Sequence, residues 1–239
     1  MSPSPFLGEF AGTALLLTMG CGVVANVVLN KTKGNNSGWI VITFGWAVAV
    51  FLGVFASTTM GGGGHLNPAV TIAMYFFNDG FDKALLPTYL GAQFAGAFVG
   101  ALVVWVCYKQ HFDETEDKGL RLAVFSTGPA IRNPFFNFLT EMIGTFILVF
   151  GALNMSPSET SLGTLNALPV ALLVLGIGLS LGGPTGYAIN PARDLGPRIA
   201  HFILPMKNKG GSDWSYSWVP ILGPIVGGLL GALLFYNVV

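Results

Sequence analysis

The chain has 239 residues, of which 52% are hydrophobic and 9% are charged, and its 11 basic and 11 acidic side chains leave no formal net charge. A soluble domain usually carries about a quarter of its residues as Asp, Glu, Lys or Arg, so this composition excludes an ordinary globular enzyme and predicts a membrane protein with several spans. A neutral chain lacks the basic surface that nucleic acid requires, and two cysteines without metal-ligand spacing predict no disulfide framework, metal site or cofactor.

Six apolar stretches are long enough to cross a bilayer as helices. A hydrocarbon core about 30 Å thick requires roughly 20 apolar residues per helix. Two further apolar segments, 67–77 and 190–202, are about half that length, which predicts re-entrant half-helices that enter the membrane and return. In chain order the predicted spans are 6–30, 39–60, 84–108, 138–155, 165–182 and 218–239.

The second half of the chain repeats the first. Phe6-Leu7-Gly8-Glu9 opens the first predicted span, Phe138-Leu139-Thr140-Glu141 opens the fourth, and each half contains three spans and one half-helix. Because three is odd, the second half must enter the membrane from the opposite side. The sequence therefore predicts one all-α membrane domain over 1–239, an inverted 3+3 repeat in which a first repeat at 6–108 and a second at 138–239 are joined by a polar loop at 109–137.

Each predicted half-helix begins with the same tripeptide, Asn67-Pro68-Ala69 in the first repeat and Asn190-Pro191-Ala192 in the second. Asn is a favoured N-cap and Pro suits the first helical position, so one copy alone would indicate only a well-started helix. Two copies at equivalent places of an inverted repeat predict that both helix N-termini, which carry partial positive charge, meet at the centre of the membrane. There the asparagine amides can donate hydrogen bonds to a passing oxygen, while cations are repelled and a proton-conducting water chain is interrupted.

Glycine-rich segments, 61–64 and 182–186, lie just ahead of the two motifs. Non-helical backbone at membrane depth is tolerated only where it is buried in protein or lines a wet cavity. We therefore expect the carbonyl oxygens of the approaching segments to line a pathway, namely those of Gly63, Gly64, His65, Leu66, Tyr187, Ala188 and Ile189.

The paired motifs on inverted three-span repeats resemble the aquaporin family over nearly the whole chain, in particular through the runs 65–70 and 190–193. The resemblance implies a passive channel that is not an enzyme, forms a homotetramer in the cell membrane and has both termini in the cytoplasm. It also implies that Arg193, which would otherwise be a costly charge within the membrane, forms a constriction on the extracellular side. The alternative is that Arg193 merely neutralises Asp194.

Several positions resemble the glycerol-conducting branch of the family, the aquaglyceroporins, more than the water-selective channels. Gly178 stands where water channels often carry His, which predicts a wider and less polar constriction. Aromatic rings there would face the carbon atoms of a polyol and the Arg193 guanidinium would face its hydroxyl groups. The branch markers are Asp194, Arg198, Pro220 and Ile221, and the expected constriction consists of Phe44, Gly178, Tyr187 and Arg193.

Alternative roles remain open for Phe44, for Tyr187 and for the pair of Asp194 and Arg198. The aquaglyceroporin pattern has Trp where we place Phe44, and the rings of Phe44 and Tyr187 could also be ordinary packing residues. Asp194 and Arg198 are four residues apart on one helix face, so they can also pair structurally.

Glu9 and Glu141 occupy equivalent places in the two repeats. Ionisable groups at membrane depth are usually partnered, and the resemblance implies that each carboxylate accepts hydrogen bonds from the backbone ahead of one motif. The alternative role is a proton relay.

The leading interpretation is a passive channel for glycerol and other small uncharged solutes, with some water permeability, which lies in a lipid bilayer and excludes ions and protons. The alternatives are a water-selective channel and an ion-coupled transporter that uses Glu9 or Glu141.

The distribution of basic residues predicts a different membrane orientation from the one that the family resemblance implies. Most basic residues lie in loops opposite the termini, and the positive-inside rule alone would place the termini outside the cell.

Overall fold

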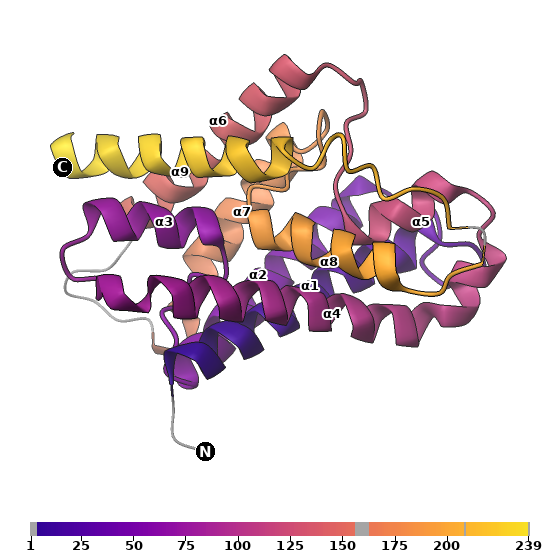
Figure 1. Ribbon diagram of the computed structural model, residues 1–239, viewed down its shortest axis with the longest axis horizontal. Coiled ribbons are helices and arrows are strands. Elements are labelled where there is room, and N and C mark those ends of the chain that lie inside the picture. The colour runs from indigo at the N-terminus through magenta and orange to yellow at the C-terminus, as the bar shows by residue number, and fades with distance from the viewer. Residues whose placement is uncertain (1–3, 156–162, 208, 239) are drawn as a thin grey trace.

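The computed structural model describes residues 4–155, 163–207 and 209–238, and Figure 1 shows them as a single elongated helical bundle. The helix α5 lies at one end of the bundle, and the start of α1 and the end of α9 lie toward the other (Figure 1), so we call these the α5 end and the terminal end. The elements in chain order are α1 (Pro5–Val28), α2 (Trp39–Thr59), α3 (Pro68–Phe77), η1 (Lys83–Leu85), α4 (Leu86–Glu114), α5 (Lys118–Phe125), α6 (Pro134–Asn154), η2 (Gly163–Leu165), α7 (Leu168–Leu181), α8 (Pro191–Ile203) and α9 (Val219–Val238).

Within the described residues, five helical segments are long and apolar enough to cross a membrane: α1, α2, η1 with α4, α6 and α9. The remaining predicted span, 165–182, which is the fifth in chain order, is the shorter helix α7, because residues 163–165 form the 3₁₀ turn η2 and the α-helix starts only at Leu168. Its 14 residues correspond to about 21 Å at about 1.5 Å per residue. Val239, the last residue of the predicted span 218–239, lies outside the described residues.

The prediction of a polar loop at 109–137 is wrong over much of its length. The helix α4 continues to Glu114, and 118–125 form α5, which Asp117 caps by accepting hydrogen bonds from the amides of Gly119 (2.7 Å) and Leu120 (3.1 Å). Charged residues suggested solvated coil, but α5 is amphipathic and buries Val124 and Phe125 completely. Much of the polar stretch is therefore helical, and its helix α5 packs against the end of the bundle.

Equivalent helices of the two halves make equivalent contacts. The helix α1 packs along α4, and α6 packs along α9. The half-helices are exchanged between the halves, since α3 packs on α9 and α8 packs on α4. This pattern confirms the inverted 3+3 repeat with two re-entrant half-helices.

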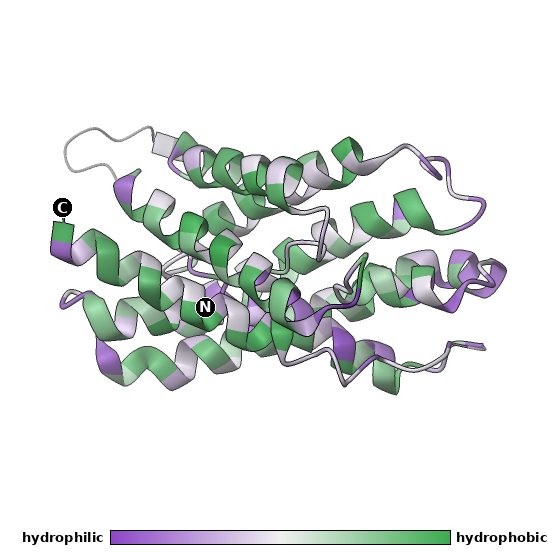
Figure 2. Cartoon of the chain, turned by 90° about the horizontal axis from the view of Figure 1, so that it is seen from above, coloured by the Kyte–Doolittle hydropathy of each residue, from purple (hydrophilic) through white to green (hydrophobic). Residues whose placement is uncertain are grey.

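The distribution of hydrophobic residues matches a bundle that lies in a membrane. Figure 2 shows hydrophobic residues along the long helices and hydrophilic residues gathered mainly toward the two ends. Many large apolar side chains on the outward helix faces are exposed, for example Ile40, Val106 and Leu172. Inside the bundle, α3 and α8 lie end to end (Figure 1), with their N-termini near its centre.

Candidate functional site

Both half-helices start at an asparagine whose side chain caps its own helix. The Oδ1 atom of Asn67 accepts a hydrogen bond from the amide of Ala69 (2.9 Å). The Oδ1 atom of Asn190 accepts from the amides of Ala192 (3.0 Å) and Arg193 (3.2 Å). These are the N-cap bonds that the tripeptides predict, and they satisfy part of the free N–H groups at each helix start.

The same two asparagines also tie the half-helices together across the centre of the bundle. The Nδ2 atom of Asn67 donates to the carbonyl oxygen of Ile189 (2.8 Å), and Nδ2 of Asn190 donates to that of Leu66 (2.8 Å). A primary amide has two N–H groups, so each asparagine keeps one N–H for a further acceptor. The carbonyls of Leu66 and Ile189, two of those expected to line the pathway, accept these cross-links, and each oxygen keeps a second lone pair.

The backbone that leads into the second motif is held by a buried carboxylate. Glu141 on α6 accepts hydrogen bonds from the amides of Ala188 (3.0 Å, to Oε1) and Ile189 (2.8 Å, to Oε2). Tyr187 and Ile189 have positive φ angles of 38° and 43°, which non-glycine residues adopt only at a cost. The carboxylate therefore stabilises a backbone conformation that the local sequence does not favour.

The first motif has the equivalent support from Glu9 on α1. Its carboxylate accepts from the amides of His65 (3.0 Å) and Leu66 (2.8 Å), as well as from Oγ of Ser57 (3.1 Å) and Nε2 of Gln93 (2.8 Å). Like Glu141, Glu9 is buried and lines neither of the cavities described next.

Two cavities share part of their lining inside the bundle. The central cavity, about 140 Å³, is lined by both motif asparagines, and by the same measure one water needs only about 10–15 Å³. The second cavity, about 250 Å³, opens toward α5 and is lined in part by Ser126 and Thr127. Trp46, Tyr187 and Arg193 line both cavities, and we call these three side chains the boundary trio.

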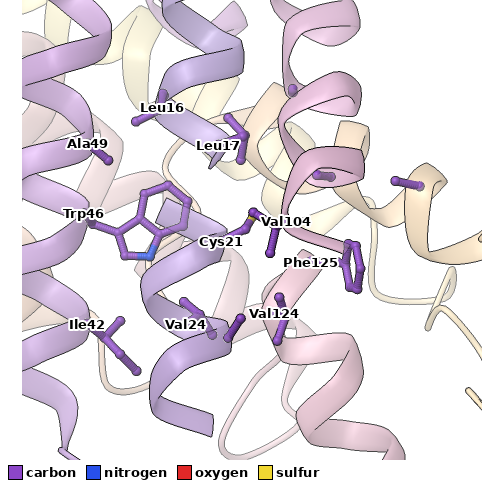
Figure 3. Close-up of a cluster of buried hydrophobic side chains, with 14 of the residues drawn as sticks. Leu16, Leu17, Cys21, Val24, Ile42, Trp46, Ala49, Val104, Val124 and Phe125 are labelled. Atoms are coloured by element: carbon purple, nitrogen blue, oxygen red, sulfur yellow. The ribbon is translucent and has the colours of Figure 1, made fainter. Parts of the chain in front are cut away.

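The expectation that Phe44 belongs to the constriction is wrong, because Trp46, and not Phe44, lines the two cavities. Phe44 is 59% exposed on the outer surface of α2, whereas Trp46 is 4% exposed. Two residues along an α-helix turn the side-chain direction by about 200°, so only one of the two can point inward. Figure 3 shows the Trp46 indole projecting from α2 toward α1, and its ring centroid lies 4.2 Å from Cζ of Arg193.

Of the other expected constriction residues, Tyr187 and Arg193 line both cavities and Gly178 lies behind the Tyr187 ring. Arg193 is buried, and its Nη1 atom donates to the carbonyl oxygen of Phe125 (3.4 Å), which leaves other N–H groups of the guanidinium for solutes. Gly178 lines neither cavity. A Cβ atom there would lie 2.8 Å from Cζ of Tyr187, so the glycine makes room for the tyrosine ring.

Among the expected carbonyl positions, Gly63 lies apart from the others. The remaining six line the central cavity, while Gly63 does not. Its backbone faces α4, where a Cβ atom would lie 2.8 Å from the Tyr89 hydroxyl.

The Asp194–Arg198 pair is structural. Both side chains are fully buried, and Arg198 donates five hydrogen bonds, the full donor capacity of a guanidinium. Two go to Asp194, and the others go to the carbonyls of Thr127, Ser212 and Asp213. Asp194 in turn accepts from the amide (2.7 Å) and the hydroxyl (2.8 Å) of Thr127. The pair thus fixes the segment next to Phe125, which accepts from Arg193.

The remaining two expected branch markers, Pro220 and Ile221, lie near the start of α9 and line neither cavity.

Comparison with known proteins gives matches over almost the whole chain. Residues 3–235 match the family described as "Major intrinsic protein". The chain is 56% identical over 229 residues to "Glycerol uptake facilitator protein 3" of Lactiplantibacillus plantarum, which covers 96% of this chain and 94% of that protein. It is also 56% identical over 232 residues to "Probable glycerol uptake facilitator protein" of Thermotoga maritima, covering 97% and 98% of the two chains.

Among solved structures, the chain is similar to the X-ray structure of the aquaglyceroporin from Plasmodium falciparum. The TM-score is 0.84 at 32% sequence identity, and the match covers 98% of this chain and 95% of that one.

The buried Asp194–Arg198 pair generates a stability prediction. Arg198→Met leaves the Asp194 carboxylate buried without its partner, so the free energy of unfolding should fall by about 3–5 kcal/mol. The measurement is thermal or denaturant unfolding of the detergent-solubilised protein.

Arg132→Met is the matched control, because Arg132 forms a partly exposed ion pair with Asp213 on the same end of the bundle. Burial raises the pKa of the Asp213 carboxyl, but hydrogen bonds from Arg132 and Ser215 outweigh burial and hold the pKa below its ordinary value, so the pair is ionised at neutral pH. Exposed pairs contribute at most about 1 kcal/mol. Equal losses in the two variants would contradict the role of Arg198.

Proposed function

The chain belongs to the major intrinsic protein family, and from that premise we propose that it is a passive channel for glycerol and other small uncharged solutes, with some water permeability, that excludes ions and protons. The family consists of channels and not of enzymes. The observation that carries the proposal is that two cavities meet at the boundary trio, with both motif asparagines in the wall of the central one.

The boundary trio has the chemistry of a glycerol filter. The rings of Trp46 and Tyr187 offer an apolar wall to the carbon atoms of a polyol, and the Arg193 guanidinium offers donors to its hydroxyl groups. Beyond the trio, each motif asparagine keeps one N–H to donate to a solute oxygen. A small molecule that is apolar on one side and hydroxylated on the other fits this arrangement.

The same arrangement disfavours cations and protons. Arg193 carries a full positive charge at the boundary, and the N-termini of α3 and α8 place partial positive charge at the centre of the pathway. Half-helix dipoles and an arginine are established means of excluding protons and cations from such pores.

The geometry disfavours an ion-coupled transporter. That function requires a carboxylate on the pathway, and Glu9 and Glu141 are instead buried against loop amides. A water-selective channel is the closer alternative. Against it stand Gly178, which leaves room for an aromatic ring, and relatives whose names specify glycerol uptake.

We extend the proposal to the membrane setting. The protein is a multi-pass protein of the cell membrane, forms a homotetramer as its family resemblance implies, and has its termini in the cytoplasm, which places the α5 end outside. The outward apolar helix faces support contact with lipid and with neighbouring subunits.

Orientation is testable by thiol labelling of intact cells. In a Cys107→Ser background, Lys118→Cys on exposed α5 should react with a membrane-impermeant maleimide added outside, because we place α5 outside. Asp79→Cys, exposed just after α3 near the terminal end, should react only after the cells are permeabilised. The reverse pattern would show that the charge bias, and not the family resemblance, gives the orientation.

The proposed function is tested in proteoliposomes by stopped-flow light scattering with glycerol, urea and water gradients. The protein should accelerate glycerol flux well above that of empty liposomes, without saturation or dependence on an ion gradient. Glycerol flux equal to that of empty liposomes, with rapid water flux, would establish the water-selective alternative. Collapse of glycerol uptake on addition of an uncoupler would establish the transporter.

Gly178→Val tests the assigned boundary. The new side chain must displace the Tyr187 ring toward the cavities, so glycerol permeability should fall about tenfold or more, and by more than water permeability. Gly176→Val is the control, because on the outer face of α7 a Cβ atom meets nothing within 4 Å. Unchanged glycerol flux in Gly178→Val would show that Tyr187 does not bound the pathway.

A further inference from the structure

Trp39, the first residue of α2, contacts two of the residues that form the boundary or support it. Its indole Nε1 donates a hydrogen bond to the carbonyl oxygen of Gly178 in the last turn of α7 (3.0 Å). Its ring lies 5.7 Å from the Tyr187 ring at an interplanar angle of 78°, the edge-to-face geometry that aromatic pairs favour. One side chain thus bridges α7 and the loop that carries Tyr187.

The Tyr187 ring depends on such packing for its position. Its hydroxyl is buried and has no hydrogen-bond partner among the described residues, and its backbone has a positive φ of 38°. The ring packs against Gly178 and Gly182 at the end of α7, where a Cβ atom at Gly182 would lie 2.5 Å from Cδ1 of Tyr187 and 2.8 Å from Cζ2 of Trp39. Contacts with neighbours, and not polar bonds, therefore hold this ring.

Trp39 also occupies the place where a solute would approach the boundary. It lines the cavity on the α5 side together with the boundary trio. A change at Trp39 therefore acts on the wall of that cavity and on the orientation of the Tyr187 ring at the same time.

We propose that Trp39 is a positioning residue that holds the Tyr187 ring against α7, clear of the pathway, and thereby sets the width of the boundary for glycerol. This rests on the proposed function, because the width matters only if solutes pass the trio. Without the indole, the Tyr187 ring tilts into the lumen, which obstructs glycerol more than the smaller water molecule.

The alternative explanation for Trp39 is that it anchors the helix in the membrane, since tryptophan is enriched where helices meet the membrane–water interface. An anchoring role would change the amount of inserted protein, and so would scale all permeabilities together. A positioning role changes the ratio of glycerol to water permeability. That ratio is independent of how much protein is inserted, so it separates the two explanations.

The experiment measures this ratio in proteoliposomes for Trp39→Leu and Trp39→Phe. Leucine removes both the ring contact and the N–H donor, so the ratio should fall about two- to tenfold, the range to which loss of one aromatic pair corresponds. Phenylalanine keeps a ring beside Tyr187 and should have a smaller effect in the same direction. An unchanged or increased ratio in Trp39→Leu would overturn the proposal.

Trp218→Leu is the matched control. Trp218 is 41% exposed, as Trp39 is, but it stacks on Phe138 and lines neither cavity. Its substitution should leave the ratio as it is in the unsubstituted protein. A fall equal to that in Trp39→Leu would show that the ratio responds to the loss of a tryptophan outside the boundary, and would overturn the positioning role.

A double-mutant cycle shows whether Trp39 acts through Tyr187. In a Tyr187→Leu background, Trp39→Leu should cause no further fall in the ratio, because the ring that it positions is absent. A full additional fall would overturn the proposal. Failure of the proposed function would appear differently, as an unsubstituted protein that conducts no glycerol at all.

Discussion

The structure depends on the need to end two helices in the middle of a membrane. In hydrocarbon an unpaired backbone N–H or C=O costs several kcal/mol, so a chain that reverses there must supply every partner itself. The protein does so with two carboxylates and two amides: Glu9 and Glu141 accept from the approaching loops, and Asn67 and Asn190 cross-link them. Asn67 and Asn190 also line the central cavity, so the side chains that join the two loops are also ones that a solute there would meet.

The two halves satisfy their backbone N–H and C=O groups in the same way, but their loops have different roles. The first loop is held from several sides, since Glu9 also binds Ser57 and Gln93, and it contributes only cavity wall. The second loop also carries Tyr187 and Arg193, and the segment beside it is fixed by the buried Arg198. The inverted repeat thus supplies a symmetric frame, to which the first half adds Trp46 and the second half adds Tyr187 and Arg193 at the boundary between the cavities.

Local chemistry in the sequence predicted the starts of both half-helices and the repeat, because an Asn-Pro-Ala tripeptide specifies its own N-cap. The prediction for Phe44 was wrong because the glycine-rich segment 61–64 has no helical periodicity. The directions of the α2 side chains therefore could not be counted back from the first motif. Trp46 could have been predicted, because the family resemblance implies a tryptophan at the constriction position that we assigned to Phe44. The contacts of Gly178 with Trp39 join residues far apart in the chain and follow from no motif, so they emerge only from the fold.

The central claim is that both asparagines cross-link the loops while offering their remaining N–H groups to one common lumen. A crystal structure of the protein soaked with glycerol tests this most directly. We predict glycerol oxygens within hydrogen-bond distance of Nδ2 of both Asn67 and Asn190, with the bonds to Ile189 and Leu66 intact. Asparagines turned away from the lumen, or glycerol bound only elsewhere, would contradict it.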